Sequence, residues 1–93
     1  MSDVIETPEA RLKRLRMRSW RRGTKEMDMV LGPYADANLA QMDEATLTLY
    51  DALLDEYDPD LYLWVSGARP CPPEYLDLLA IIAAFARTRR PGA

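Results

Sequence analysis

The sequence contains no histidine and only one cysteine, Cys71. Histidine is the side chain best suited to proton transfer near neutral pH, so its absence excludes Ser-His and Cys-His mechanisms. A single thiol cannot form a disulfide within the chain, and without histidine no cluster typical of a zinc or haem site remains. Paired carboxylates could still act as acid and base, but a small helical chain leaves little room for a deep substrate cleft. We therefore expect no catalytic residues, no bound metal and an inert thiol.

Long apolar runs are also absent. No uninterrupted apolar stretch approaches the ~20 residues of a membrane-spanning helix. The first ten residues contain Asp3, Glu6 and Glu9 but no Lys or Arg, which excludes a secretory signal peptide and disfavours a transit peptide. These features predict a cytoplasmic protein that does not insert into a membrane.

The composition is that of an ordinary globular domain. Hydrophobic residues make up 48% and charged residues 29% of the 93 residues, so wholesale disorder is not expected. A chain of this length forms one domain and buries only about 60 to 65% of its unfolded surface. We expect a thin hydrophobic core.

Five segments combine an apolar period of 3.6 residues with residues that start or stop helices. They begin at Thr7-Pro8, Thr24, Asp43, Asp58-Pro59 and Pro73, and they end near Arg22, Leu39, Glu56, Gly67 and Pro91. Thr7, Asp43 and Asp58 are the expected N-caps. Gly32-Pro33 interrupts the second segment, which predicts either a kinked helix or two short ones.

The segments predict an all-α fold, a compact five-helix bundle in a single domain. The expected domain spans residues 7–90, between a flexible tail at 1–6 and a short tail at 91–93. The third segment carries Leu47, Tyr50, Leu54 and Tyr57 on one side, and we expect it to be the central packing helix. Trp64 is expected to be a core anchor.

Charge changes sign at one point of the chain. Eight of the twelve Lys and Arg residues lie between Arg11 and Lys25, whereas ten of the fifteen Asp and Glu residues lie between Glu26 and Asp60. A basic helix face of this kind is more often solvated than a binding site. The change of sign falls in residues 20–28, which we call the corner. Gly23 is expected to adopt a left-handed conformation there and to end the first helix.

The corner also carries a resemblance. Arg22-Gly23-Thr24-Lys25-Glu26 fits an RGxxE pattern, which Met27 and Asp28 continue. Further matches are Gly32-Pro33-Tyr34-Ala35 and Asp58-Pro59-Asp60-Leu61 followed by Trp64. In order and spacing, this set resembles the SdhE family, the flavinylation and assembly factors of succinate dehydrogenase, over roughly residues 8 to 88. The resemblance implies a small all-helical protein that binds the flavoprotein subunit and promotes covalent attachment of FAD to it.

The resemblance also implies the site. It places partner contacts at Arg22, Gly23 and Glu26, with secondary candidates at Arg18, Arg21 and Asp28. From periodicity alone, Arg22 and Glu26 would only complement the dipoles of their helices, by ~0.3 to 1 kcal/mol each. The turn between them is too short to bury them, so we expect exposed charges beside Trp20. Loss of either charge is then expected to cost at most ~1 kcal/mol of stability.

In mechanism, the resemblance assigns the chemistry to FAD and to a histidine of the partner, because the bond joins the flavin methyl carbon to a histidine nitrogen. This chain has no histidine, so its contribution is positional. It lacks a glycine-rich dinucleotide fingerprint, and no stably bound FAD is expected. The expected partner is the flavoprotein subunit of succinate dehydrogenase, with that of fumarate reductase as a further candidate. The free chain is expected to be a monomer.

Two other functions compete with this one. The basic first segment could contact a phosphate backbone, although the net charge of −3 disfavours a polyanion beyond that segment. A generic helical adaptor, such as an antitoxin that binds its toxin, is the third possibility.

Overall fold

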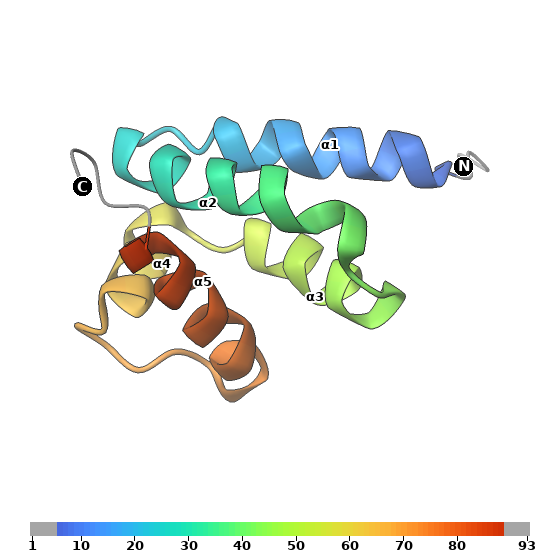
Figure 1. Cartoon of the computed structure of the whole chain (residues 1–93). Helices are drawn as coiled ribbons and strands as arrows, with labels where there is room; N and C mark the ends of the chain where they lie inside the picture. Colours follow the sequence, from blue (N-terminus) through green and yellow to red (C-terminus); the bar gives the residue numbers. More distant parts are fainter. Residues whose placement is uncertain (1–5, 89–93) are drawn as a thin grey trace.

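The computed structural model describes residues 6–88, which form five α-helices (Figure 1). These are α1 (Pro8–Trp20), α2 (Lys25–Asn38), α3 (Glu44–Leu54), α4 (Asp58–Ser66) and α5 (Leu76–Thr88), with short 3₁₀ helices η1 (Leu39–Gln41) and η2 (Pro73–Tyr75). The described residues contain no strand. The prediction of an all-α five-helix protein is confirmed. The predicted tails lie outside the described residues, apart from Glu6.

Side-chain caps begin three of the helices, at the predicted places. Thr7 accepts a hydrogen bond from the backbone N–H of Ala10 at 3.1 Å, and Asp43 accepts one from Thr46 at 2.8 Å. Thr24 caps α2 through the N–H of Met27 at 3.4 Å. Each cap satisfies an N–H that the first helical turn leaves unpaired. Helix α1 nevertheless ends at Trp20, two residues before the predicted end.

The interpretation of Asp58 as an N-cap is wrong. Helix α4 follows Tyr57 and has no side-chain cap, and Asp58 is its first residue. Its carboxylate turns to Arg22 instead. The predicted stop is confirmed, because Gly67 has a φ of +83° at the end of α4.

Helix α2, rather than α3, is the central packing helix. It lies beside α1 and also contacts α4, α5 and η1 (Figure 1). Its residues Met27, Leu31, Tyr34 and Ala35 are all buried. Helix α3 buries Tyr50, Leu53 and Leu54, but Tyr57, expected on its buried side, lies beyond the end of the helix and is 70% exposed. The prediction for the third segment is therefore wrong at this point.

Helix α2 continues through Pro33 without a break, so the predicted alternative of two short helices is wrong. The adjacent Gly32 has a different role. A Cβ atom there would overlap the ring of Trp20, so the glycine allows the indole to lie against α2. The indole Nε1 donates to Asp36 Oδ2 at 3.2 Å. Trp20 thereby fixes the end of α1 on α2.

The core is continuous across the helices. Ser19 at the end of α1 and Tyr50 of α3 share a buried hydrogen bond of 2.6 Å. Tyr34 of α2 meets Phe85 of α5 edge-on, with ring centroids 5.5 Å apart. Trp64 packs against the core and stacks on Tyr75 at 6.2 Å, as its predicted role requires. Within residues 6–88, no helix has the length and apolar character needed to cross a membrane.

Candidate partner-binding site

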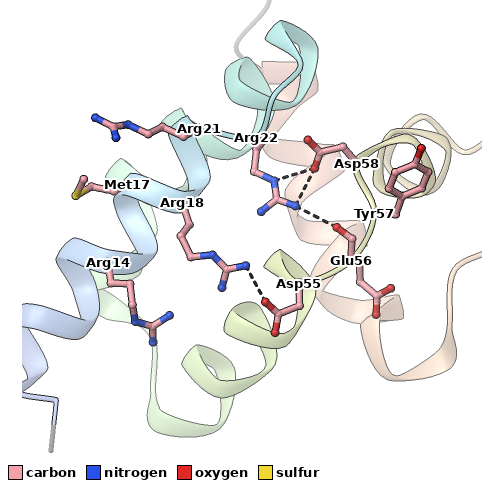
Figure 2. Close-up of a pocket in the computed structure, with 9 residues that line it drawn as sticks. All are labelled: Arg14, Met17, Arg18, Arg21, Arg22, Asp55, Glu56, Tyr57 and Asp58. Carbon is pink, nitrogen blue, oxygen red and sulfur yellow. Dashed lines mark hydrogen bonds and ion pairs between the residues drawn. The ribbon is translucent and has the colours of Figure 1, made fainter. Parts of the chain in front are cut away.

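Arg22 lies inside the molecule. Its side chain is 8% exposed and its ion-pair partner Asp58 is 11% exposed, with Nη2 2.8 Å from Oδ1. Nε donates to the same oxygen at 2.9 Å. Nη2 donates to the carbonyl of Glu56 at 3.1 Å (Figure 2). Nη1 donates to the carbonyl of Leu54 at 2.6 Å. The guanidinium therefore ties the end of α1 to the segment that joins α3 to α4.

The expectation that Arg22 is an exposed charge beside Trp20 is wrong. The turn itself is too short to bury Arg22. The segment from Leu54 to Asp58 buries it instead, although this segment lies more than thirty residues later in the sequence. Trp20 is turned toward α2 and Asp36. Arg22 is thus a residue that shapes the corner, and its guanidinium is occupied by internal partners.

Gly23 and Asp28 set the path of the chain through the corner. Gly23 is exposed and has a φ of +94°, which confirms the predicted left-handed conformation. Asp28 Oδ1 accepts the backbone N–H of Arg22 at 2.7 Å. With Thr24 capping α2, these contacts fix the turn from both sides. Asp28 is half-buried, and its position supports a structural role.

Like the secondary candidate Arg21, Glu26 remains on the surface without a side-chain partner among residues 6–88. It is exposed, and within residues 6–88 its carboxylate makes no ion pair or hydrogen bond. It lines a hollow of about 300 Å³ together with Thr24, Asp58, Pro59 and Tyr62. We call this the Glu26 hollow. Tyr62 is 48% exposed, so its ring is accessible beside the carboxylate.

A larger groove adjoins the Glu26 hollow through Asp58, which lines both. It has a volume of about 750 Å³ and is shown in Figure 2, lined by Arg14, Met17, Arg18, Arg21, Arg22, Asp55, Glu56, Tyr57 and Asp58. Met17 is 43% and Tyr57 70% exposed. Arg21 points away from the other side chains drawn in Figure 2, and within residues 6–88 it has no ion pair. Apolar surface and an available cation therefore lie on the same face.

Three basic residues of α1 pair with carboxylates of α3 or of Asp55, the residue that follows it. Arg11 pairs with Glu44, Arg14 with Asp51, and Arg18 with Asp55. The hydrogen bond from Arg14 holds the pKa of Asp51 below its usual value, and that from Arg11 lowers the pKa of Glu44. The two charge blocks of the sequence thus meet across an interface. Arg18, a secondary candidate, belongs to this interface as well as to the groove.

A comparison with protein families decides what kind of chain this is. Residues 13–87 match the family model described as "Flavinator of succinate dehydrogenase". The chain belongs to this family. The match includes the whole corner and both residues of the buried ion pair.

Relatives of this flavinator family come from bacteria and eukaryotes. The chain is 36% identical over 84 residues to "FAD assembly factor SdhE" of Acetobacter pasteurianus, covering 89% of this chain and 77% of that protein. It is 39% identical over 70 residues to "Succinate dehydrogenase assembly factor 2, mitochondrial" of Schizosaccharomyces pombe, covering 75% and 50%. The Drosophila grimshawi protein of the same name is 37% identical over 67 residues, with 70% and 46% covered. The chain thus spans about half the length of these two eukaryotic relatives.

Sequence reasoning missed part of the surface around the corner. Tyr57 was assigned to a buried helix face, and neither Tyr62 nor Met17 was considered. The available signal was the break before Asp58-Pro59, because a side chain between two helices has fewer neighbours than one inside a helix. Such a signal could have placed Tyr57 on the surface, although not beside Arg22.

Proposed function

We propose that this chain binds the flavoprotein subunit of succinate dehydrogenase and promotes the covalent attachment of FAD to it. Membership of the flavinator family supports the proposal, as do the names of the bacterial and eukaryotic relatives. The role is that of a non-catalytic chaperone. It needs a surface that recognises another protein, and the exposed groups around the corner support such a role.

In this mechanism, as the family resemblance implies, the nucleophile is a histidine of the partner. This chain contains no histidine. Contact with the corner would hold the immature subunit in the arrangement in which its histidine nitrogen meets the flavin methyl carbon. Such positioning accelerates a reaction by removing the entropic cost of bringing the groups together. It requires no FAD bound stably to this chain. A flavoprotein subunit of fumarate reductase would meet the same requirement.

The observation that carries the proposal is the environment of Glu26. A carboxylate without a partner contributes little to the fold, yet here it lines a hollow together with the half-exposed Tyr62. Asp58 connects this hollow to the groove that the exposed Tyr57 lines. Tyrosines that keep accessible ring surface are typical anchors of protein interfaces. Gly23, in the turn before α2, is also exposed. Arg22 contributes indirectly, because it holds the segment that presents Tyr57.

The test is covalent flavinylation of a co-expressed succinate dehydrogenase flavoprotein subunit, measured as flavin fluorescence of the denatured subunit on a gel. Glu26→Ala is expected to reduce it sharply, since loss of an interface anchor can cost ~2 kcal/mol or more of binding. The free energy of unfolding of the variant, measured by thermal melting, should change by less than about 1 kcal/mol. Binding of the two purified proteins is measured in parallel.

Glu9→Ala is the matched control. Glu9 is likewise an exposed glutamate in the first turn of a helix, α1, but it lies away from the corner. It should leave flavinylation at the parental rate. If Glu26→Ala also flavinylates at the parental rate while melting like the parent, the corner does not contact the flavoprotein.

The nucleic-acid alternative loses support from the structure. Arg11, Arg14 and Arg18 are occupied by carboxylates of α3, and Arg16 lies 3.3 Å from Asp36. Phosphate binding needs cations that are free to replace counterions. A cytoplasmic location remains a prediction, since the related proteins include a bacterial one and several named as mitochondrial.

A further inference from the structure

We propose that the Glu26 hollow is a receptor for a guanidinium group. The inference rests on the proposed function in one respect, namely that the group would come from an arginine of the flavoprotein subunit. Three features of the hollow carry it: an unsatisfied carboxylate oxygen, an uncompensated negative charge, and an accessible aromatic ring.

The unsatisfied oxygen is Oδ2 of Asp58. Within residues 6–88, it is the one buried side-chain oxygen or nitrogen without a hydrogen-bond partner. Both bonds from Arg22 go to Oδ1, and Oδ2 points away from the guanidinium in Figure 2. Asp58 is one of the residues that line the Glu26 hollow, and Oδ2 lies 4.0 Å from the point where a Cβ of Gly23 would be. A buried acceptor without a donor calls for a partner that is not part of the fold.

The charge of the hollow selects a cation. Two helices begin here, α2 and α4, and each N-terminus carries about half a positive charge. That charge is offset by four carboxylates in their first turns, at Glu26, Asp28, Asp58 and Asp60. Arg22 and Lys25 add two positive charges nearby. The balance is about one negative charge. Asp58 is paired with Arg22, and Asp28 accepts the backbone N–H of Arg22, whereas Glu26 lines the hollow and has no bonding partner within residues 6–88.

The ring of Tyr62 favours guanidinium over ammonium. Arginine presents a planar group that stacks on an aromatic ring while its N–H groups bond carboxylates in the plane. In the Glu26 hollow, those donors would face Glu26 on one side and Asp58 on the other. An ammonium group is a compact point charge with a tighter hydration shell, and it cannot span the two carboxylates in this way.

The test uses the isotope-labelled full chain and two small probes, ethylguanidinium and ethylammonium chloride, titrated at constant ionic strength. Backbone amide shifts are followed by NMR. Ethylguanidinium is expected to shift the amides of Gly23, Thr24, Glu26 and Tyr62 to saturation, and to bind roughly 3-fold or more tightly than ethylammonium. Shifts that do not saturate, or that are equal for both probes, would overturn the proposal.

Variants locate the binding. Glu26→Gln keeps the shape of the side chain and removes its charge, and it is expected to weaken ethylguanidinium binding by about 5- to 10-fold. Tyr62→Ala should weaken it less and should abolish the preference over ethylammonium. Glu9→Gln is the control and should change nothing. An unchanged affinity in Glu26→Gln would show that the probe binds elsewhere and would refute the assignment.

The outcome is separable from that of the proposed function. Ethylguanidinium should compete with the flavoprotein subunit for the parent chain but not for Glu26→Gln. If the subunit binds and is flavinylated while the probe fails to bind, the receptor is wrong and the assembly role stands. If the probe binds the hollow but the subunit does not bind the chain, the assembly role fails and the guanidinium site remains.

Discussion

Three arginines of one basic stretch each hold a carboxylate at 2.8 Å, yet they do so in different surroundings. The side chains of Arg22 and Asp58 are 8% and 11% exposed. Those of Arg14 and Asp51 are 38% and 28% exposed, and in the pair of Arg11 with Glu44 the carboxylate is 78% exposed. Distance alone therefore does not rank these pairs. Burial does, because water screens an exposed pair and leaves a buried one with no substitute partner.

The difference separates two parts of the molecule. Along α1 and α3, the pairs form a half-solvated seam that matches a basic face to an acidic one. At the corner, Arg22 also holds the carbonyls of Leu54 and Glu56. Removal of its side chain would leave the Asp58 carboxylate and the Glu56 carbonyl without these donors, whereas the Leu54 carbonyl would keep the bond from Arg18. The seam contributes to complementarity between helices. The corner fixes the path of the chain, and with it the surface that carries Glu26.

The largest effect is expected for Arg22→Ala, which should lower the free energy of unfolding by roughly 3 to 5 kcal/mol by leaving Asp58 buried and unpaired. This reverses the sequence-based expectation of at most ~1 kcal/mol for that residue. Urea unfolding followed by circular dichroism measures it. Flavinylation should also fall, but through loss of folded protein.

Two further variants check the cause. Glu26→Ala, four residues away, should melt almost like the parent. Arg22→Met combined with Asp58→Leu should recover part of the lost stability, since apolar replacement of a buried ion pair is often tolerated. An Arg22→Ala protein as stable as the parent would show that burial does not distinguish the corner from the seam.

Gly32→Ala is expected to cost about 1 to 3 kcal/mol, the range typical of overpacking in a well-packed site. The new Cβ would overlap the Trp20 ring, pushing the end of α1, and Arg22 with it, away from α2. The thermal melt of the variant measures the cost. Trp20→Ala in the same chain should remove the clash, so the double variant should lose less than the sum of the two single changes.

The sequence predicts the structural roles of some of these residues better than those of others. Helix starts at Thr7, Thr24 and Asp43 depend on neighbours within one turn, so they were predictable. Trp20 beside Gly32 and Arg22 beside Asp58 are contacts between different elements. The local sequence pattern does not show which distant segment of the chain will pack against a given side chain. For that reason the sequence predicts a site at the corner, but it wrongly predicts that Arg22 is exposed and that Asp58 is a helix N-cap.

Gly23→Ala should lower stability by about 1 kcal/mol, because a φ of +94° is strained for a residue with a side chain. Its space is open, since the nearest atom to a new Cβ would be Asp58 Oδ2 at 4.0 Å. The loss of stability should therefore come from backbone strain alone. It should be smaller than that of Gly32→Ala, where the new Cβ has no room. Melting temperatures of the two variants, measured side by side, make the comparison. Equal losses would contradict this division between backbone strain and crowding.

The smallest effect is expected in the seam, for Asp51→Asn. Because Arg14 lowers the pKa of Asp51 in the folded chain below its ordinary value of 3.8, the unfolded chain takes up the proton more readily. The stabilisation is thus present above about pH 4 and is lost as pH falls through the lowered pKa. For a pair this exposed it should amount to at most about 1 kcal/mol near neutral pH. Asp51→Asn should lose that amount and should show a shallower decline in stability below about pH 4.

Urea unfolding of Asp51→Asn at a series of pH values, beside the parent, measures both effects. Asp77→Asn is the control, because Asp77 is exposed and makes no side-chain bond within residues 6–88; its decline should match that of the parent. A decline equally steep in Asp51→Asn would mean that the seam is too well solvated to couple stability to protonation. The Arg22–Asp58 pair would then still differ from the seam, because its contribution to stability depends on burial. A loss of several kcal/mol would instead place the seam in the same class as the corner, and exposure would no longer explain how the three pairs differ.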